Sequence, residues 1–258
     1  MIPKTIHYCW FGGKPLSELA LKCIESWKKF CPDYEIMRWD ESNFDFASCD
    51  YAREAYAAKK YAFVSDYARL KVLVDHGGVY MDTDVEVINP LDKFMSEHAF
   101  SGFESQTMIP TGIIACEKGF AMFAEMLREY DTRHFILSDG SIDLTTNVTA
   151  ITNYCSLHGF IPNNTKQTIN GFTLYPKDYF CPKTIEVSPE GMLSFKMEMT
   201  ENTCTIHHFA GSWLPKQTLW LKFKRRIQRL IGKKLTEKIL AVKRFFRRIL
   251  IRRRLRTW

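Results

Sequence analysis

Hydrophobic positions along this chain follow two patterns: short apolar runs, and longer stretches in which apolar residues recur at helical spacing. Short apolar runs between turn residues are typical of buried strands, and helical spacing is typical of helices packed on a core. The expected strands are Thr5–Cys9, Tyr34–Trp39, Val79–Asp82, Ala99–Phe103 and Gly112–Cys116. The expected helices are Ser17–Phe30, Ala52–His76, Phe120–Tyr130 and Thr145–Leu157, with short strands between Phe172 and His208. This alternation favours an α/β fold with a largely parallel sheet covered by helices on both faces.

The composition agrees with one globular domain and a C-terminal extension. With 46% hydrophobic residues among 258, the chain has enough apolar side chains for a sizeable core. No internal repeat, low-complexity tract or clear linker interrupts the sequence before its last part. We therefore expect a globular domain over residues 1–214 and a separate tail over residues 215–258.

The cysteines and the first residues bear on location. Eight cysteines are scattered without the CxxC spacing of a zinc site, which favours free buried thiols. The first residues lack the charged and apolar regions of a secretory signal, and no apolar run approaches the length of a membrane span. Together these features predict a cytoplasmic protein.

Two carboxylates, Asp82 and Asp84, follow the apolar run Gly77–Met81. Alternate side chains of a strand point to one face, so residues two apart can converge on one cation, and Mg²⁺ or Mn²⁺ prefers oxygen ligands. Such an ion neutralises the charge that develops on a departing diphosphate. If the ligand is a nucleotide diphospho-sugar, the pair would serve its transfer, so the pair suggests a transferase. The alternative is a solvated turn, where Asp is common.

A predicted helix leads into this strand. Residues Tyr61–His76 carry apolar positions at helical spacing, and Gly77 follows where a left-handed C-terminal cap is expected. Asp66 and Arg69 are three apart, so they are neighbours on one face of the helix. A purely structural ion pair is the alternative to a role in binding.

Three ordered motifs resemble a known family. The stretches Phe63–Arg69 and Gly77–Asp84 resemble the signature of the DXD-containing sugar transferases. These include bacterial capsule and O-antigen transferases, fungal initiating mannosyltransferases and the glucosylating domain of large clostridial toxins. Ile2–Gly12 resembles the opening strand of the family, and His207–Trp213 its closing motif. The resemblance covers roughly residues 1–214 and implies a GT-A-type fold.

The resemblance implies roles for individual residues around the donor. Trp10 would stack on the base of the donor, unless it is an ordinary core tryptophan. Asp66 and Arg69 would contact the donor sugar, and Tyr80 lies on the strand that positions the aspartates. Asp82 would contact ribose and metal, and Asp84 would bind the metal directly.

The closing motif and the acceptor site carry further expectations from the resemblance. His207 or His208 would complete the shell of Mn²⁺ or Mg²⁺, and since adjacent strand residues point to opposite faces, only one of them can reach it. Ser212 and Trp213 would close over the diphosphate. Asn147 is a candidate acceptor residue, with a helix N-cap as the alternative for its polar surroundings.

The resemblance also implies a mechanism and substrates. The sequence contains no Ser-His-Asp arrangement, GxSxG or P-loop. Relatives retain anomeric configuration, which agrees with front-side attack assisted by the departing diphosphate. We expect a retaining hexosyltransferase that takes a UDP-sugar and transfers to a glycan, such as a lipid-linked oligosaccharide of capsule or lipopolysaccharide O-antigen synthesis.

The tail differs from the body in charge. From Lys216 to Trp258 it contains 17 of the 36 basic residues and one of the 29 acidic ones, which gives it a net charge of +16 and the remainder −9. Its apolar positions recur at helical spacing, which predicts amphipathic helices that bind an anionic membrane surface peripherally, at the inner face of the plasma membrane. Packing on the body or on a second copy is the alternative. Nucleic-acid binding is not expected, because the body is acidic and lacks a recognition motif.

Two rival functions remain at this stage. Haloacid dehalogenase-type phosphatases also place DxD after a strand, but their motif normally follows the first strand and continues differently from Val85 and Glu86. A non-enzymatic cationic membrane adaptor is the second rival, and it would have no use for the acidic pair.

Overall fold

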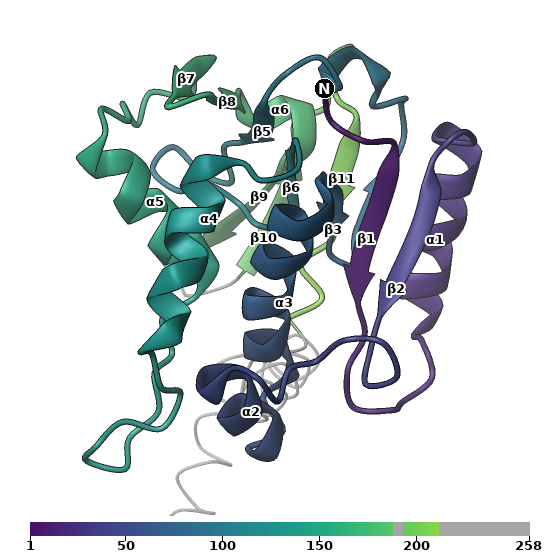
Figure 1. The fold of residues 1–258 in the computed structure, drawn as a ribbon. Coiled ribbons are helices and arrows are strands. Elements are labelled where there is room, and N and C mark those ends of the chain that lie inside the picture. Colours follow the sequence, from purple (N-terminus) through teal and green to yellow (C-terminus); the bar gives the residue numbers. More distant parts are fainter. Residues whose placement is uncertain (188–192, 212–258) are drawn as a thin grey trace, which may run out of the picture. The chain divides into compact units, whose positions relative to one another are not determined.

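The computed structural model describes residues 1–187 and 193–211 (Figure 1). Within these ranges, a seven-stranded sheet has the order β2-β1-β3-β6-β5-β8-β7. Its strands are β1 (Thr5–Cys9), β2 (Glu35–Trp39), β3 (Gly78–Met81), β5 (Ala99–Gly102), β6 (Ile113–Cys116), β7 (Gln167–Ile169) and β8 (Phe172–Tyr175). The pairings make five strands run the same way, whereas β6 and β7 run against them. The prediction of a largely parallel sheet is confirmed.

Helices cover both faces of this sheet. They are α1 (Glu18–Phe30), α2 (Asp50–Ala57), α3 (Tyr61–His76), α4 (Ala121–Arg128), α5 (Asn147–Leu157) and α6 (Lys177–Phe180), with 3-10 turns η1 (Asp92–Phe94) and η2 (Glu129–Asp131). Val79 and Met81 share a buried cluster with Trp27 of α1, whereas Tyr80 between them belongs to the opposite cluster with Leu70 of α3. This alternation along β3 places an apolar layer on each side of the sheet and confirms the α/β prediction.

The expected single helix over Ala52–His76 is wrong, because the chain breaks between α2 and α3. Lys59 has a φ of 57°, in the left-handed region. The Lys59 N–H donates to the Tyr56 carbonyl and the Lys60 N–H to the Ala55 carbonyl, both at 2.8 Å. This is the Schellman pattern that ends a helix, here without the glycine that usually marks it in a sequence.

The turn between α3 and β3 requires its two glycines. Gly77 and Gly78 have φ values of 69° and 102°. A Cβ atom on Gly77 would lie 2.6 Å from the backbone nitrogen of Lys118, and one on Gly78 would lie 2.6 Å from the Thr5 carbonyl oxygen. The predicted tight turn is confirmed, and it fixes the direction in which β3 delivers Asp82.

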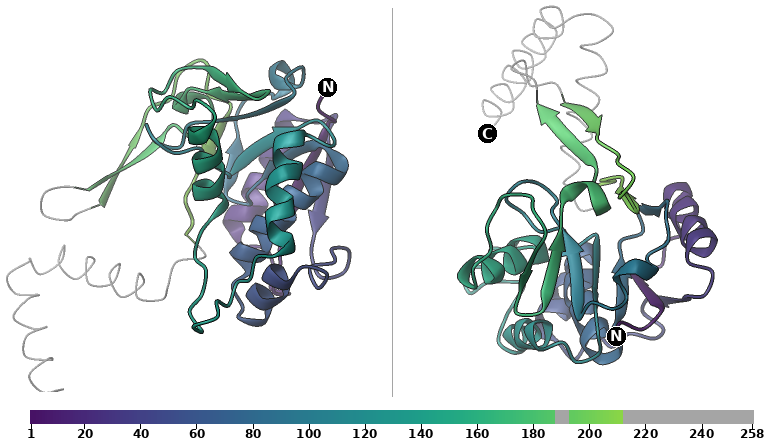
Figure 2. Two further views of the ribbon diagram at one scale, coloured as in Figure 1. Left: turned by 60° about the vertical axis from the view of Figure 1, so that its left-hand side comes forward. Right: turned by 90° about the horizontal axis from the view of Figure 1, so that it is seen from above.

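Two small sheets complete the described fold. β4 (Val85–Val87) pairs antiparallel with β11 (Thr205–His207), and β9 (Lys183–Val187) pairs antiparallel with β10 (Leu193–Met197). Figure 2 shows the β9–β10 hairpin standing away from the central sheet. The β4–β11 pairing brings the last described strand beside the residues that directly follow β3.

The cysteines, the apolarity of the helices and the domain boundary bear on three further predictions. All eight cysteines are free and buried, as predicted. No helix within residues 1–187 and 193–211 has the length and apolarity needed to cross a bilayer. The domain boundary at residue 214 and the tail over residues 215–258 lie outside the described residues.

Candidate metal centre

Asp82 and Asp84 lie on a turn that is fixed at both ends. The Asp82 N–H donates to the Gly112 carbonyl at 2.8 Å, and the Val85 N–H donates to the Asp82 carbonyl at 3.0 Å. β3 ends immediately before this turn and β4 begins immediately after it. The two carboxylates therefore start from an anchored backbone at the carboxyl end of a buried strand.

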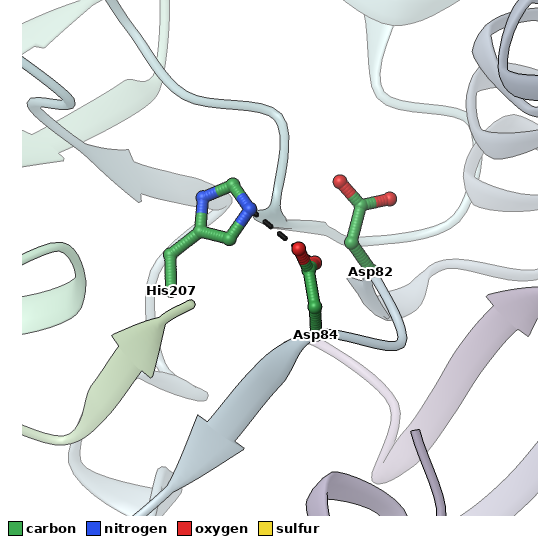
Figure 3. Close-up of side chains that lie close together, drawn as sticks. All are labelled: Asp82, Asp84 and His207. Atoms are coloured by element: carbon green, nitrogen blue, oxygen red, sulfur yellow. Dashed lines mark ion pairs between the residues drawn. The ribbon is translucent and has the colours of Figure 1, made fainter. Parts of the chain in front are cut away.

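His207 completes a cluster with the two aspartates (Figure 3). It is the last residue of β11, and it lies opposite Val85 in the antiparallel register. Its Nε2 atom is 3.3 Å from Oδ1 of Asp84. One ligand atom from each of Asp82, Asp84 and His207 lies within 4.8 Å of the others, and these three residues are called the metal cluster below.

The donor set of the metal cluster fits a divalent cation. Two carboxylates and an imidazole are ligands that Mn²⁺ and Mg²⁺ accept, the carboxylates above all. The Nδ1 atom of His207 is buried without a hydrogen-bond partner among protein groups of the described ranges. Although burial alone raises the pKa of Asp84, His207 holds it below its ordinary value, and Asp84 in turn raises the pKa of His207. The cluster thus concentrates the negative charge of two carboxylates, of which Asp84 pairs with His207 and Asp82 with Arg69.

Two contacts hold the His207 ring in place. A Cβ atom on Gly112 would lie 3.0 Å from its Cε1 and Nδ1 atoms, so any larger residue here would require the ring or the loop to shift by a few tenths of an ångström. On another side the ring of Phe209 stacks at 4.1 Å between centroids. Gly112 therefore serves two parts of the site, because its carbonyl also holds the backbone of Asp82.

His208 points away from the metal cluster. Its Nε2 atom lies 2.8 Å from Oε2 of Glu86, a carboxylate that also pairs with Lys22. Its backbone N–H donates to the Asp84 carbonyl at 2.9 Å. The structure thus brings together only His207 and the aspartates, whereas His208 was an equal candidate from sequence.

Arg69 connects the two acidic sites. Its Nη2 atom donates to Oδ1 of Asp82 at 3.1 Å, and its Nη1 atom lies 3.4 Å from Oδ1 of Asp66. Thr111 accepts from the same guanidinium through its hydroxyl. Burial works against the positive charge, but Asp82, Tyr80 and Asp66 raise the pKa of Arg69 above its ordinary value. Asp66 and Arg69 do form the expected ion pair, and Arg69 extends it to the metal cluster.

Tyr80 shares the same oxygen of Asp82. Its hydroxyl donates to Oδ1 at 3.1 Å, and the Arg69 guanidinium lies 4.8 Å from the centre of its ring. One oxygen of Asp82 is thus held by two donors. Side chains of β3 and α3 therefore orient the carboxylate of Asp82.

Asn147 holds Asp66 from the start of α5. Its backbone N–H lies 3.3 Å from Oδ2 of Asp66, and its amide donates to the Asp66 carbonyl at 2.6 Å. Its own Oδ1 accepts from the hydroxyl of Tyr130 at 2.9 Å. The residue is 1% exposed, and Thr146, not Asn147, is the helix N-cap. Its contacts are with the protein interior, and a role at the acceptor stays a prediction.

Trp10 and the closing motif are the other predicted parts of the site. Trp10 follows β1 and is partly buried, and its Nε1 donates to the Lys14 carbonyl at 2.6 Å. The Ala210 N–H donates to Oδ2 of Asp84 at 2.7 Å, so the closing motif reaches the cluster. Ser212 and Trp213 lie outside the described residues.

Sequence reasoning missed the loop between β5 and β6. It contributes Thr111, which contacts Arg69, and Gly112, which packs under His207. Glu104 lies at its start, directly after an expected strand, which is a position where a site carboxylate could have been sought. Burial raises the pKa of Glu104, with His207 opposing and Asp82 adding to the rise.

Comparisons with known proteins agree with this geometry. Residues 17–101 match the family model described as a glycosyltransferase sugar-binding region containing a DXD motif. Inositol phosphoceramide mannosyltransferase 3 of Schizosaccharomyces pombe is 29% identical over 135 residues, which are 49% of this chain and 36% of that protein. The chain thus spans about a third of this curated relative.

Similar solved structures include two glycosyltransferases. The PaToxG glycosyltransferase has a TM-score of 0.41 at 23% identity, over 49% of this chain and 59% of that one. The galactosyltransferase LgtC, solved with donor and acceptor sugar analogues, has a TM-score of 0.41 at 13% identity, over 84% and 91%.

The matched segment contains Asp66, Arg69, Tyr80, Asp82 and Asp84. Four of these residues are joined by hydrogen bonds or ion pairs, and Asp84 adds His207 from outside the segment. Over residues 17–101 this chain is therefore similar to the DXD-containing sugar-binding region of glycosyltransferases.

Proposed function

We propose that this protein is a metal-dependent GT-A-type glycosyltransferase that moves a hexose from a nucleotide diphospho-sugar to a glycan acceptor. The observation that carries the proposal is the metal cluster, whose two aspartates follow β3 inside the segment that matches the DXD family and whose histidine comes from β11. Asp82, Asp84 and His207 would hold Mn²⁺ or Mg²⁺. When bound, the ion supplies positive charge beside the diphosphate, where negative charge develops.

The protein groups around the cluster have separate tasks. Arg69 and Tyr80 orient Asp82 through one of its oxygens and leave the other free for the ion. Asp66 is buried against Arg69 and positions the guanidinium toward the donor. Trp10 is proposed to stack on the base, and Ser212 and Trp213 to close over the diphosphate.

The reaction that we propose retains anomeric configuration. The bond between the anomeric carbon and the phosphate oxygen breaks, and its electron pair stays on that oxygen. The acceptor oxygen bonds to the carbon from the same face and gives its proton to the departing phosphate oxygen. Because the leaving group serves as base, positioning and electrostatics supply most of the acceleration. NMR of the first-formed linkage checks this, and an inverted anomer would reject it.

A panel of donors tests the function. Wild-type protein is incubated with UDP-, GDP- and TDP-hexoses and Mn²⁺, and release of nucleotide is measured with and without a chelator. We expect one donor class, a UDP-hexose, to be consumed only with metal. Since the similar fungal protein is named a mannosyltransferase, mannose donors belong in the panel. Phosphate release from phosphomonoesters would favour a phosphatase, and inertness would favour an adaptor.

We propose that the acceptor is a lipid-linked glycan of capsule or O-antigen synthesis at the cytoplasmic face of the membrane. Attachment of the tail to an anionic membrane would bring the enzyme to such an acceptor. The support for attachment is the charge of +16 from Lys216 to Trp258 and the helical spacing of the apolar residues there. Sedimentation with anionic liposomes at low salt tests the attachment. A truncated chain ending at Trp213 that sediments as well as the full chain would reject it.

A further inference from the structure

The loop between β5 and β6 forms one wall of the metal cluster. Its last residues contact three parts of the site: Thr111 accepts from Arg69, the Gly112 carbonyl accepts from the Asp82 N–H, and the Gly112 Cα lies under His207. The loop is also anchored elsewhere, because the Ile109 N–H donates to Oγ1 of Thr152 at 3.0 Å. This wall is therefore a fixed part of the site.

Glu104 stands at the first corner of this loop. β3 and β5 both run antiparallel to β6, so their carboxyl ends lie at one edge of the sheet. Met81 lies opposite Ile113 in β6, and the register of β5 places Gly102 at the same level on the other side of β6. Residues that directly follow β5 consequently emerge beside those that directly follow β3.

The backbone of Glu104 is held in this position. Its N–H donates to the Met108 carbonyl at 2.8 Å, and the N–H of Phe103 donates to the Tyr175 carbonyl at 3.0 Å. The hydroxyl of Ser101 donates to the Ile113 carbonyl at 2.8 Å and ties β5 to β6 just before the corner. The backbone position from which the Glu104 side chain starts is thus fixed by hydrogen bonds.

The carboxylate of Glu104 has no partner in the described part of the chain. It is partly buried, yet it makes no hydrogen bond and no ion pair there. The other acids of the site are all engaged: Asp66 and Asp82 with Arg69, Asp84 with His207, and Glu86 with His208. Within the described residues, no protein group therefore binds the Glu104 carboxylate.

Glu104 interacts electrostatically with residues of the metal cluster but is not one of its ligands. Asp82 and His207 both act on its charge, in opposite directions. The group of described residues that converges within 4.8 Å contains Asp82, Asp84 and His207, and Glu104 does not belong to it. Glu104 therefore belongs to the surroundings of the metal cluster and not to its ligand set, which leaves its carboxylate available to the sugar of a bound donor.

We propose that Glu104 faces the transferred sugar and that its negative charge stabilises the positive charge that develops at the anomeric carbon. This inference rests on the proposed function and deepens it. As the bond to the phosphate oxygen breaks, its electron pair leaves with the diphosphate and the sugar ring becomes oxocarbenium-like. Glu104 keeps its charge throughout and forms no bond, and the proton of the acceptor goes to the phosphate oxygen as described above.

Three variants test this assignment. Glu104→Gln removes the charge and keeps the shape, and Glu104→Asp keeps the charge. Glu35→Gln is the control, because Glu35 is exposed on β2 and has no side-chain partner among the described residues. Removal of one preorganised electrostatic contact typically lowers kcat by about 100-fold or more, so we expect a loss of that size for Glu104→Gln. Donor KM should change less than about threefold, and Glu104→Asp should recover at least about tenfold in kcat over Glu104→Gln.

A binding measurement separates the sugar from the metal and the fold. The affinity of each variant for Mn²⁺ with the free nucleoside diphosphate should equal that of wild type, because that ligand lacks the sugar. A Glu104→Gln variant with kcat within about twofold of wild type, or with weakened Mn²⁺ and nucleotide affinity, would overturn the inference. If the wild type is active and Glu104→Gln gives one of these two results, only this inference fails. If the wild type transfers no sugar, the proposed function fails and this inference fails with it.

Discussion

The Nε2 atom of His207 lies 3.3 Å from Oδ1 of Asp84, although Asp84 belongs to the matched segment over residues 17–101 and His207 lies far beyond it in the sequence (Figure 3). The contact depends on the pairing of β11 with β4, in which His207 lies opposite Val85. A residue near the end of the described chain thus completes a site that begins at β3.

Replacement of His207 should weaken metal binding, whereas replacement of its neighbour should not. Loss of a direct ligand removes at least one coordination bond, and we expect His207→Ala to lower Mn²⁺ affinity by at least about tenfold, the loss typical of even indirect support groups. His208→Ala is the matched control, because that ring pairs with Glu86. Calorimetric titration with Mn²⁺ measures both. Equal affinities in the two variants would contradict the placement.

Gly112→Ala should disturb the site through the His207 ring. The added methyl group would meet the ring at 3.0 Å, so the ring must move or the loop must shift. We expect weaker Mn²⁺ binding in Gly112→Ala, and no further loss when the same change is made in His207→Ala, where the ring is gone. A double-mutant cycle on Mn²⁺ affinity measures this coupling. Strictly additive losses would show that the methyl group acts elsewhere.

The burial of Asp66 should appear in the pH dependence of stability. Burial raises the pKa of Asp66 from 3.8 to about 6, so the folded state binds this proton more tightly than the unfolded state. The resulting stabilisation is complete below pH 3.8 and is lost as the pH rises through about 6, a change of about 3 kcal/mol. Asp66→Asn should lack this decline. Urea unfolding of both proteins from pH 4 to 6.5 checks it, and parallel curves would refute it.

Asn147 should contribute mainly to stability. Asn147→Ala removes the amide that donates to the Asp66 carbonyl and leaves the Tyr130 hydroxyl without its partner, and a buried unpaired group costs about 1–3 kcal/mol. Tyr130→Phe removes the second of these groups, so the double variant should be less destabilised than the sum of the single changes. The free energy of unfolding in urea measures the three. A loss below about 0.5 kcal/mol for Asn147→Ala would contradict the buried network.

Much of the architecture follows from local pattern. Apolar runs fixed the positions of β1, β3, β5 and β6, and the two glycines after His76 marked the turn that aims Asp82. The ion pair of Asp66 and Arg69 follows from helical spacing. These features depend on residues close in sequence, which is why periodicity reaches them.

Long-range features were beyond that reasoning. The chain breaks between α2 and α3 at Lys59, whose backbone is in the left-handed region, so no glycine in the sequence marks the break. The choice between His207 and His208 depends on the register of β11 against β4, which tertiary packing sets. Thr111, Gly112 and Glu104 reach the site because β6 runs antiparallel between β3 and β5, an order that the sequence pattern does not reveal.

Mn²⁺-dependent turnover of the donor by wild type and by the double variant Asp82→Asn, Asp84→Asn tests the central claim most directly. Nucleotide release is followed while Mn²⁺ is titrated into chelator-treated protein. We predict no release from wild type without metal, saturable activation by Mn²⁺, and no activation of a folded double variant at any Mn²⁺ concentration. Release that persists in chelator, or a double variant as active as wild type, would contradict the account.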